Sequence, residues 1–156
     1  MKILAFDPGF ERLGIAVVER VGGKDTLIHS ACAQTPKEIP FHERLHMLGA
    51  EVEAAIARFS PDAVALENVY FEKNAKTAIN VAAVRGVLAY IAATHDLPLY
   101  EYTPLQVKVA VTGYGKSDKA AVAAMVPRLV TLPARKRLDD EIDAIAVGLT
   151  CLASIR

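Results

Sequence analysis

The chain has 156 residues, which is long enough for one sizeable core and too short for two ordinary domains, so we expect a single domain over residues 1–156. Hydrophobic residues make up 53% and charged residues 23%, which excludes a disordered chain, and the net charge of zero does not by itself indicate a nucleic-acid partner. With two cysteines, no signal-peptide pattern and no apolar run that we expect to span a bilayer, the composition favours a cytoplasmic protein.

The first third of the chain predicts three antiparallel strands and then a helix. A short apolar run stops at the turn signal Asp7-Pro8-Gly9, and Gly22-Gly23 separates the next two strands. Apolar residues then recur at helical spacing. The predicted elements are strands at Lys2–Phe6, Leu13–Val18 and Thr26–Ala33 and a helix at Phe41–Phe59.

The remainder of the chain alternates strands with helices and then ends in helices. Pro127 lies inside one predicted helix, which it should break or kink. The order of elements predicts an α/β fold with a mixed five-stranded sheet, three antiparallel strands followed by two parallel ones, and helices on both faces. The predicted elements are strands at Ala63–Leu66 and Leu97–Tyr102 and helices at Asn74–Ala93, Pro104–Val111, Ser117–Val130 and Asp139–Ile155.

The predicted helix Asn74–Ala93 is apolar around its whole circumference. A helix of this kind must be covered on more than one side. We therefore expect the sheet on one face and, on the other, either a partner subunit or the later helices of the same chain.

Charge is unevenly distributed along the sequence. Between Glu72 and Arg137 there are ten basic residues against four acidic ones, whereas the segments on either side are acidic. A basic middle between acidic ends is typical of a surface that binds phosphates around a metal site. Chance segregation on solvated faces explains the same pattern equally well.

Two carboxylates are predicted at the ends of neighbouring strands. Asp7 ends the first strand, and Glu67 follows the fourth. If these strands are adjacent and parallel, both side chains emerge at the same edge, where α/β sheets bind ligands. Asp7 before Pro-Gly can also be a simple turn residue, whereas Glu67 is harder to explain structurally, because a charged residue next to an apolar run usually needs a partner.

A second pair of carboxylates, Asp140 and Asp143, is three residues apart at the start of the last helix, and the two therefore share one face. Four clustered carboxylates would repel each other without a cation, and hard divalent cations take oxygen ligands. Two such ions can catalyse phosphodiester hydrolysis. The alternative is that Asp139, Asp140 and Glu141 are acids favoured by the helix macrodipole.

Four segments resemble successive motifs of the RuvC family of Holliday-junction resolvases, in the family's order and over nearly the whole chain. They are FDPGFERLGIAVVE, ALENVYFEKNAKTAINVAAVRGVLAYIAA, LYEYTPLQVKVAVTGYGKSDKAAVAAMV and DDEIDAIAVGLTCLA. The resemblance implies an RNase H-like fold, a homodimer, and paired symmetric cuts in four-way DNA junctions. It also implies two Mg²⁺ or Mn²⁺ ions per active site and the branch-migration proteins RuvA and RuvB as partners.

The resemblance also assigns roles to individual residues. It implies that the metal-binding catalytic residues are Asp7, Glu67, Asp140 and Asp143. A second set matches basic or aromatic positions with which the family contacts DNA. This set consists of Tyr70, Phe71, Lys73, Lys108, Lys116 and Lys119.

Some assignments stay open at this stage. Either Tyr70 or Phe71 would stack on bases, and Phe71 is equally compatible with a place in the core. Asp139 and Glu141 leave the register of the closing acidic pair ambiguous. His42 and His46 have a metal-binding spacing but no third ligand nearby, so we expect solvated surface histidines.

Three other functions compete with a junction resolvase. An actin-like or sugar-kinase ATPase would use Asp7, Gly9 and Gly14 as a phosphate loop but would need a second comparable domain. A related nuclease would cut RNA or RNA–DNA hybrids. A DNA-binding module with a degenerate site would bind junctions without cutting them.

Overall fold

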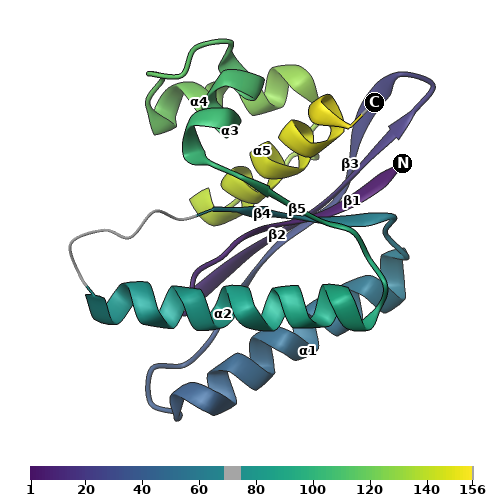
Figure 1. Cartoon of the computed structure of the whole chain (residues 1–156). Coiled ribbons are helices and arrows are strands. Elements are labelled where there is room, and N and C mark those ends of the chain that lie inside the picture. The colour runs from purple at the N-terminus through teal and green to yellow at the C-terminus, as the bar shows by residue number, and fades with distance from the viewer. Residues whose placement is uncertain (69–74, 156) are drawn as a thin grey trace.

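The computed structural model describes residues 1–68 and 75–155, and its centre is one mixed five-stranded sheet in the order β3-β2-β1-β4-β5 (Figure 1). The pairs β1/β2 and β2/β3 are antiparallel, whereas β1/β4 and β4/β5 are parallel. The predicted sheet, with three antiparallel strands followed by two parallel ones, is therefore confirmed. The strands are β1 (Lys2–Asp7), β2 (Arg12–Val21), β3 (Lys24–Gln34), β4 (Ala63–Glu67) and β5 (Leu99–Tyr102).

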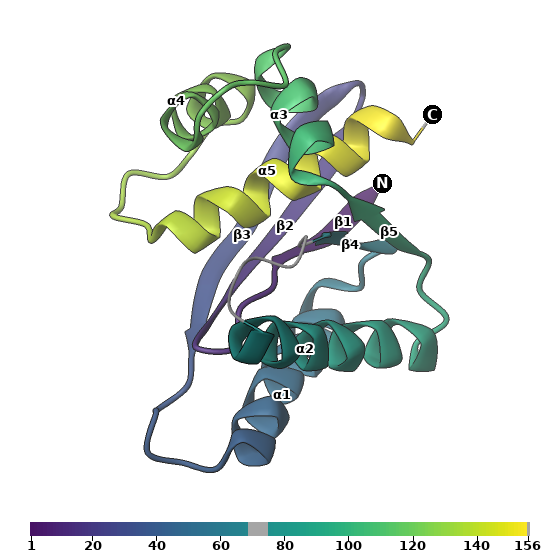
Figure 2. The same ribbon diagram turned by 60° about the vertical axis from the view of Figure 1, so that its left-hand side comes forward.

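The described part of the chain forms five helices in two layers, one on each face of the sheet. Helices α1 and α2 cover one face, and α3, α4 and α5 cover the other (Figures 1 and 2). Because side chains alternate along a strand, Ile3 and Ala5 contribute to one core while Leu4 and Phe6 contribute to the other. The helices are α1 (Phe41–Phe59), α2 (Ala75–Thr94), α3 (Pro104–Thr112), α4 (Lys119–Leu129) and α5 (Asp139–Ser154).

Element boundaries differ from the sequence prediction where local backbone chemistry decides them. Strand β5 starts at Leu99 instead of Leu97, one residue after Pro98, which has no N–H to donate to a neighbouring strand. Helix α4 starts at Lys119 because the Asp118 side chain accepts a hydrogen bond from the backbone N–H of Ala121 (2.8 Å). The helix continues through Pro127 and ends two residues later, so the expected break before this proline is absent.

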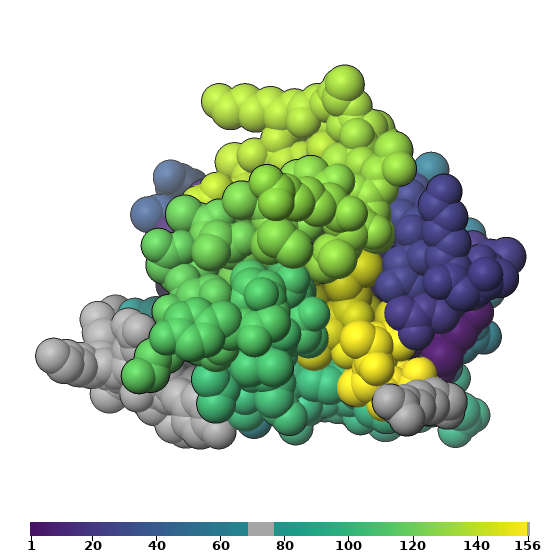
Figure 3. Space-filling view, turned by 90° about the horizontal axis from the view of Figure 1, so that it is seen from above, coloured from purple at the N-terminus to yellow at the C-terminus, as the bar shows by residue number. Residues whose placement is uncertain are grey.

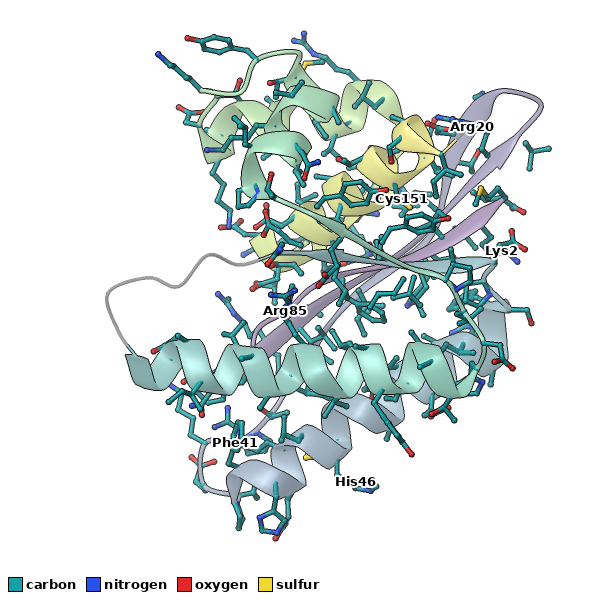
Figure 4. The ribbon with its side chains drawn as sticks, viewed as in Figure 1. Lys2, Arg20, Phe41, His46, Arg85 and Cys151 are labelled. Carbon is teal, nitrogen blue, oxygen red and sulfur yellow. The ribbon has the colours of Figure 1, made fainter. Side chains whose placement is uncertain are left out.

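Helix α2 packs on α1 and the sheet, and the chain's later helices lie on the opposite side of the sheet (Figure 1). The prediction that later helices of the same chain cover α2 is therefore wrong. The inner side carries Arg85, which donates to Asn68 (2.9 Å) and Glu101 at the end of the sheet (Figure 4). The opposite side leaves Ile79 and Tyr90 exposed.

By length and composition alone, the stretch Thr77–Thr94 of α2 is long and apolar enough to cross a membrane. The expectation that the chain has no apolar run of this kind is therefore corrected. Core helices of soluble proteins can have the same length and apolar composition. In this structure α2 contributes Val84, Leu88 and Ile91 to the core between the sheet and α1. Packing against the sheet and α1 therefore explains the apolar residues on the inner side of α2.

Helix α5 lies across β1 and β2 at close range, as Figure 2 shows. Seen from the side of α3, α4 and α5, its C-terminal part reaches the surface between α3 and the β2–β3 hairpin (Figure 3). The close approach requires a glycine, because a Cβ at Gly148 would lie 2.7 Å from Val18 Cγ2 and 3.2 Å from Ala5 Cβ. These contacts set the distance between α5 and the sheet.

We predict that Gly148→Ala destabilises the protein by about 1–3 kcal/mol, because the added methyl overpacks the core against Val18. Urea unfolding measures the change. The double variant Gly148→Ala with Val18→Ala should lose less stability than the sum of the two single variants, since removal of the valine methyls makes room. Strict additivity would show that the contact does not limit how closely α5 approaches the sheet.

Candidate active site

Asp7 and Glu67 lie side by side at the ends of two neighbouring parallel strands. In the β1/β4 register Phe6 pairs with Leu66, so the next residue of each strand is one of the two acids. Apart from Lys2 the strands are apolar up to that point, and these apolar residues are buried between both helical layers. The carboxylates are therefore delivered together to the edge where the crevice of an α/β sheet lies.

Gly14 brings the first turn of α5 onto these strand ends. It pairs with Asp7 across β1 and β2, and a Cβ at this position would lie 2.0 Å from the carbonyl oxygen of Asp140 and 3.2 Å from Asp7 Cβ. Only glycine leaves room for the helix backbone there. Asp140 and Asp143, in the first turns of α5, are thereby placed beside the strand-end acids.

The electrostatics indicate that the four acids lie near one another. Burial, together with the negative charges of Asp143, Glu67 and Asp140, raises the pKa of Asp7 to about 7. Burial also raises the pKa of Glu67 and that of Asp143. In both cases a lysine partly offsets the effect. Such carboxylates favour either a proton or a bound cation.

Two of the predicted lysines line this cluster. Lys119 Nζ lies 2.6 Å from Asp143 Oδ2, and Lys108 of α3 is close enough to lower the pKa of Glu67. Together with Glu67 and Asp143 they border a hollow of about 270 Å³. Another predicted lysine, Lys116, is exposed in the connection between α3 and α4.

The oxygen atoms of the cluster suit a hard divalent cation. Asp140 Oδ2 is buried and has no hydrogen-bond partner among the residues that the structure describes, although Arg12 Nε lies 3.4 Å away. Among the described residues no three His, Cys, Asp or Glu side chains are close enough to share an ion as they stand. Lys119 and Arg12 hold two of the carboxylates in this arrangement. The carboxylate oxygens therefore fit a divalent cation, which would bind once the side chains of Lys119 and Arg12 move away from them.

The structure separates the neighbouring acids at the start of α5. The charge of Asp140 raises the pKa of Asp7. Asp139, in contrast, is exposed and borders a second hollow with Lys119 and Asp143. Glu141 is buried and bonded to Arg135 and Ser30. Although burial acts to raise the pKa of Glu141, its hydrogen bonds from Arg135, Ser30 and the Leu138 N–H lower it.

Other predicted residues lie either outside the described part of the chain or on the surface of α1. Tyr70, Phe71 and Lys73 lie outside the described residues. His42 and His46 are exposed on α1, where His46 points away from the sheet (Figure 4). Sequence reasoning did not single out Arg12 or Arg135, because one arginine in a turn or a basic loop gives no signal of its carboxylate partner.

Comparisons with known proteins agree with this architecture. The family model for the crossover junction endodeoxyribonuclease RuvC matches residues 3–151. The crossover junction endodeoxyribonuclease RuvC of Thermosipho melanesiensis is 45% identical over 98% of this chain and 97% of its own length. The corresponding protein of Desulfitobacterium hafniense is 44% identical over 96% of this chain and 90% of its own length.

Solved structures give the same result. The RuvC of T. thermophilus in complex with a Holliday junction substrate has a TM-score of 0.90 at 34% identity, covering 96% of this chain and 92% of that chain. A second Thermus thermophilus RuvC structure has a TM-score of 0.86 at 35% identity over the same shares. The RNase H-like fold is thereby confirmed, and the ATPase alternative is left without support. The chain belongs to the RuvC family of crossover junction endodeoxyribonucleases.

Proposed function

We propose that this chain resolves four-way (Holliday) DNA junctions by paired symmetric phosphodiester cuts, in recombination and repair. The observation that carries the proposal is the gathering of four carboxylates from β1, β4 and α5 at one sheet edge, in a chain of the RuvC family. A relative 34% identical was solved in complex with a Holliday junction substrate. The family and the site chemistry therefore indicate the same reaction.

The proposed metal ligands are Asp7, Glu67, Asp140 and Asp143, which would hold two Mg²⁺ or Mn²⁺ ions per active site. Bound divalent cations would polarise the scissile phosphate and activate a water molecule. The raised pKa of Asp7 supports cation binding, and so does the buried Oδ2 of Asp140, which accepts no hydrogen bond from the described residues and lies 3.4 Å from Arg12 Nε. Neither Asp139, which is exposed, nor Glu141, whose oxygens are occupied, belongs to the proposed set.

Lysines on the rim of the site are proposed to bind the DNA backbone. Lys108 and Lys119 border the hollow beside Glu67 and Asp143, where a phosphate would approach the acids. Lys116, in the same connection as Lys119, extends this basic rim. We also propose DNA contacts by Tyr70, Phe71 and Lys73, with Tyr70 or Phe71 stacking on a base.

A homodimer is proposed because two symmetric cuts require two sites related by a two-fold axis. The outer side of α2 supplies a suitable surface. Ile79 and Tyr90 are exposed by 67% and 72%, and the small residues Ala82 and Gly86 lie between them at helical spacing. RuvA and RuvB are the proposed partners in branch migration, and the cytoplasm is the proposed location.

We predict that the wild-type protein introduces paired nicks into a synthetic four-way junction with Mg²⁺ or Mn²⁺. Asp7→Asn should bind the junction normally and cut it roughly a hundredfold or more slowly, because the loss of a metal ligand costs at least as much as the loss of an outer-shell partner. Gel electrophoresis of end-labelled arms measures both quantities.

Asp96→Asn is the matched control for this assay. The substitution is chemically identical but lies in the turn between α2 and β5, where Asp96 has a positive φ of 53° that asparagine adopts readily. Normal cutting by Asp7→Asn would overturn the site assignment. Cleavage of an RNA–DNA hybrid in preference to the junction would favour the related nuclease, and metal-dependent binding without product would favour a DNA-binding module.

The raised pKa of Asp7 predicts how stability depends on pH without metal. Because the folded-state pKa of about 7 lies above the ordinary 3.8, the unfolded chain releases this proton first, so the free energy of unfolding falls as pH rises from about 3.8 to about 7. Above that window the loss is complete and amounts to at most roughly 4 kcal/mol.

In EDTA, Asp7→Asn should therefore be more stable than the wild type at about pH 8 and equally stable at about pH 4. Urea unfolding at the two pH values measures the difference. Mg²⁺ should narrow the gap at the higher pH by stabilising only the wild type. A gap of equal size at both pH values would show that the titration of Asp7 is not its cause.

We predict that Ile79→Asp converts a dimer into monomers and replaces paired cuts by single nicks, because a charge would be buried at the interface. Sedimentation velocity measures the association. Val21→Asp is the matched control, since this residue is 65% exposed at the β2–β3 turn and away from α2. If Ile79→Asp stays dimeric, the interface lies elsewhere.

A further inference from the structure

Glu141 stands between two proposed metal ligands in sequence, but its side chain serves a different purpose. The residue is only 5% exposed, and each of its carboxylate oxygens accepts two hydrogen bonds. Oε1 accepts from Arg135 Nη1 (3.2 Å) and from the backbone N–H of Leu138 (3.3 Å). Oε2 accepts from Arg135 Nη2 (2.5 Å) and Ser30 Oγ (2.9 Å). No oxygen of this carboxylate is left for a metal ion.

Ser30 is the point at which three segments of the chain meet. It is buried on the edge strand β3, 111 residues away from Glu141 in sequence. Arg135 donates to its carbonyl oxygen and to Oγ, both at 2.7 Å, and Arg137 Nε donates to Oγ at 3.2 Å. The connection between α4 and α5 and the first turn of α5 are thus both fixed to β3.

The first turn of α5 needs an interaction that holds it against the sheet. Its N-cap is Leu138, which provides no capping side chain. Asp139, Asp140 and Asp143 then concentrate negative charge within little more than one turn, which favours movement of the helix start away from Asp7 and Glu67. The Glu141–Arg135 pair is an interaction at this turn that opposes the repulsion without using the proposed metal ligands.

We infer that Glu141 is a positioning residue, whose buried carboxylate pairs with the more exposed Arg135 over Ser30, fixes the start of α5 against β3 and holds Asp140 and Asp143 in place for cation binding. The inference rests on the proposed function, because it assigns these aspartates to the metal site. Glu141 contacts neither the cations nor the DNA in this role.

The test is direct titration of Mn²⁺ into the DNA-free protein by calorimetry, combined with junction binding in EDTA and cutting at increasing Mn²⁺. Glu141→Gln keeps the size of the side chain but removes its charge. We expect its Mn²⁺ affinity to fall by about 10–100-fold, the range found for residues that orient metal ligands. Junction binding in EDTA should stay within about twofold, and saturating Mn²⁺ should restore most of the cutting rate.

Substitutions of the partner provide a rescue series. Arg135→Met removes the ion pair and should weaken Mn²⁺ binding as Glu141→Gln does. Arg135→Lys keeps the charge but not the forked geometry and should lie between Arg135→Met and the wild type. Circular dichroism checks that each variant is folded, and Arg135→Lys carries the test if Glu141→Gln is not.

Asp25→Asn is the matched structural control. Asp25 pairs with Arg20 (2.6 Å), which also donates to the carbonyl oxygen of Leu152 and so ties the opposite end of α5 to the β2–β3 hairpin (Figure 4). This variant should lose stability without a change in Mn²⁺ affinity. Equal loss of Mn²⁺ affinity in Asp25→Asn and Glu141→Gln, or unchanged affinity in Glu141→Gln, overturns the inference. A wild type that neither binds Mn²⁺ nor cuts junctions overturns the proposed function as well.

Discussion

The close packing of α5 against β1 and β2 is the constraint on which the rest of the molecule depends. Two glycines permit it, Gly148 opposite Val18 and Ala5 in the middle of the helix and Gly14 opposite the Asp140 backbone at its start. At either position a Cβ would lie closer than 3 Å to its neighbour. The hydrophobic core on this face therefore also determines where the helical acids lie relative to the strand-end acids.

This packing places like charges together, and cationic side chains nearby offset part of that charge. Burial and mutual repulsion raise the pKa of Asp7 to about 7, which is a sign of strain in the charged state. Lys119 and Arg12 lie beside Asp143 and Asp140 as local counter-charges. On the other side of the same helix turn, Glu141 is neutralised separately by Arg135. The cluster at the sheet edge therefore retains the negative charge that a divalent cation would need.

Much of the fold was predictable because it depends on local patterns. Apolar runs bounded by turn signals identified the strands, and helical spacing identified α1 over its full length, Phe41–Phe59. The errors came from interactions that periodicity does not encode. Pro98 delays the start of β5, and α4 continues through Pro127, although this residue has no N–H to donate to the preceding turn, and ends two residues later. The uniform hydrophobicity of α2 could not reveal which neighbours cover it.

The sequence by itself determined the order of the elements, the strand-end positions of Asp7 and Glu67, and, through its motifs, the family. The tertiary structure decided the rest of the site. It separated Asp140, whose charge raises the pKa of Asp7, from Asp139 and Glu141, and it paired Glu141 with Ser30 across 111 residues. The physical reason is that strand ends are local properties of the chain, whereas the direction of an acid in a helix turn depends on how the whole helix packs on the sheet.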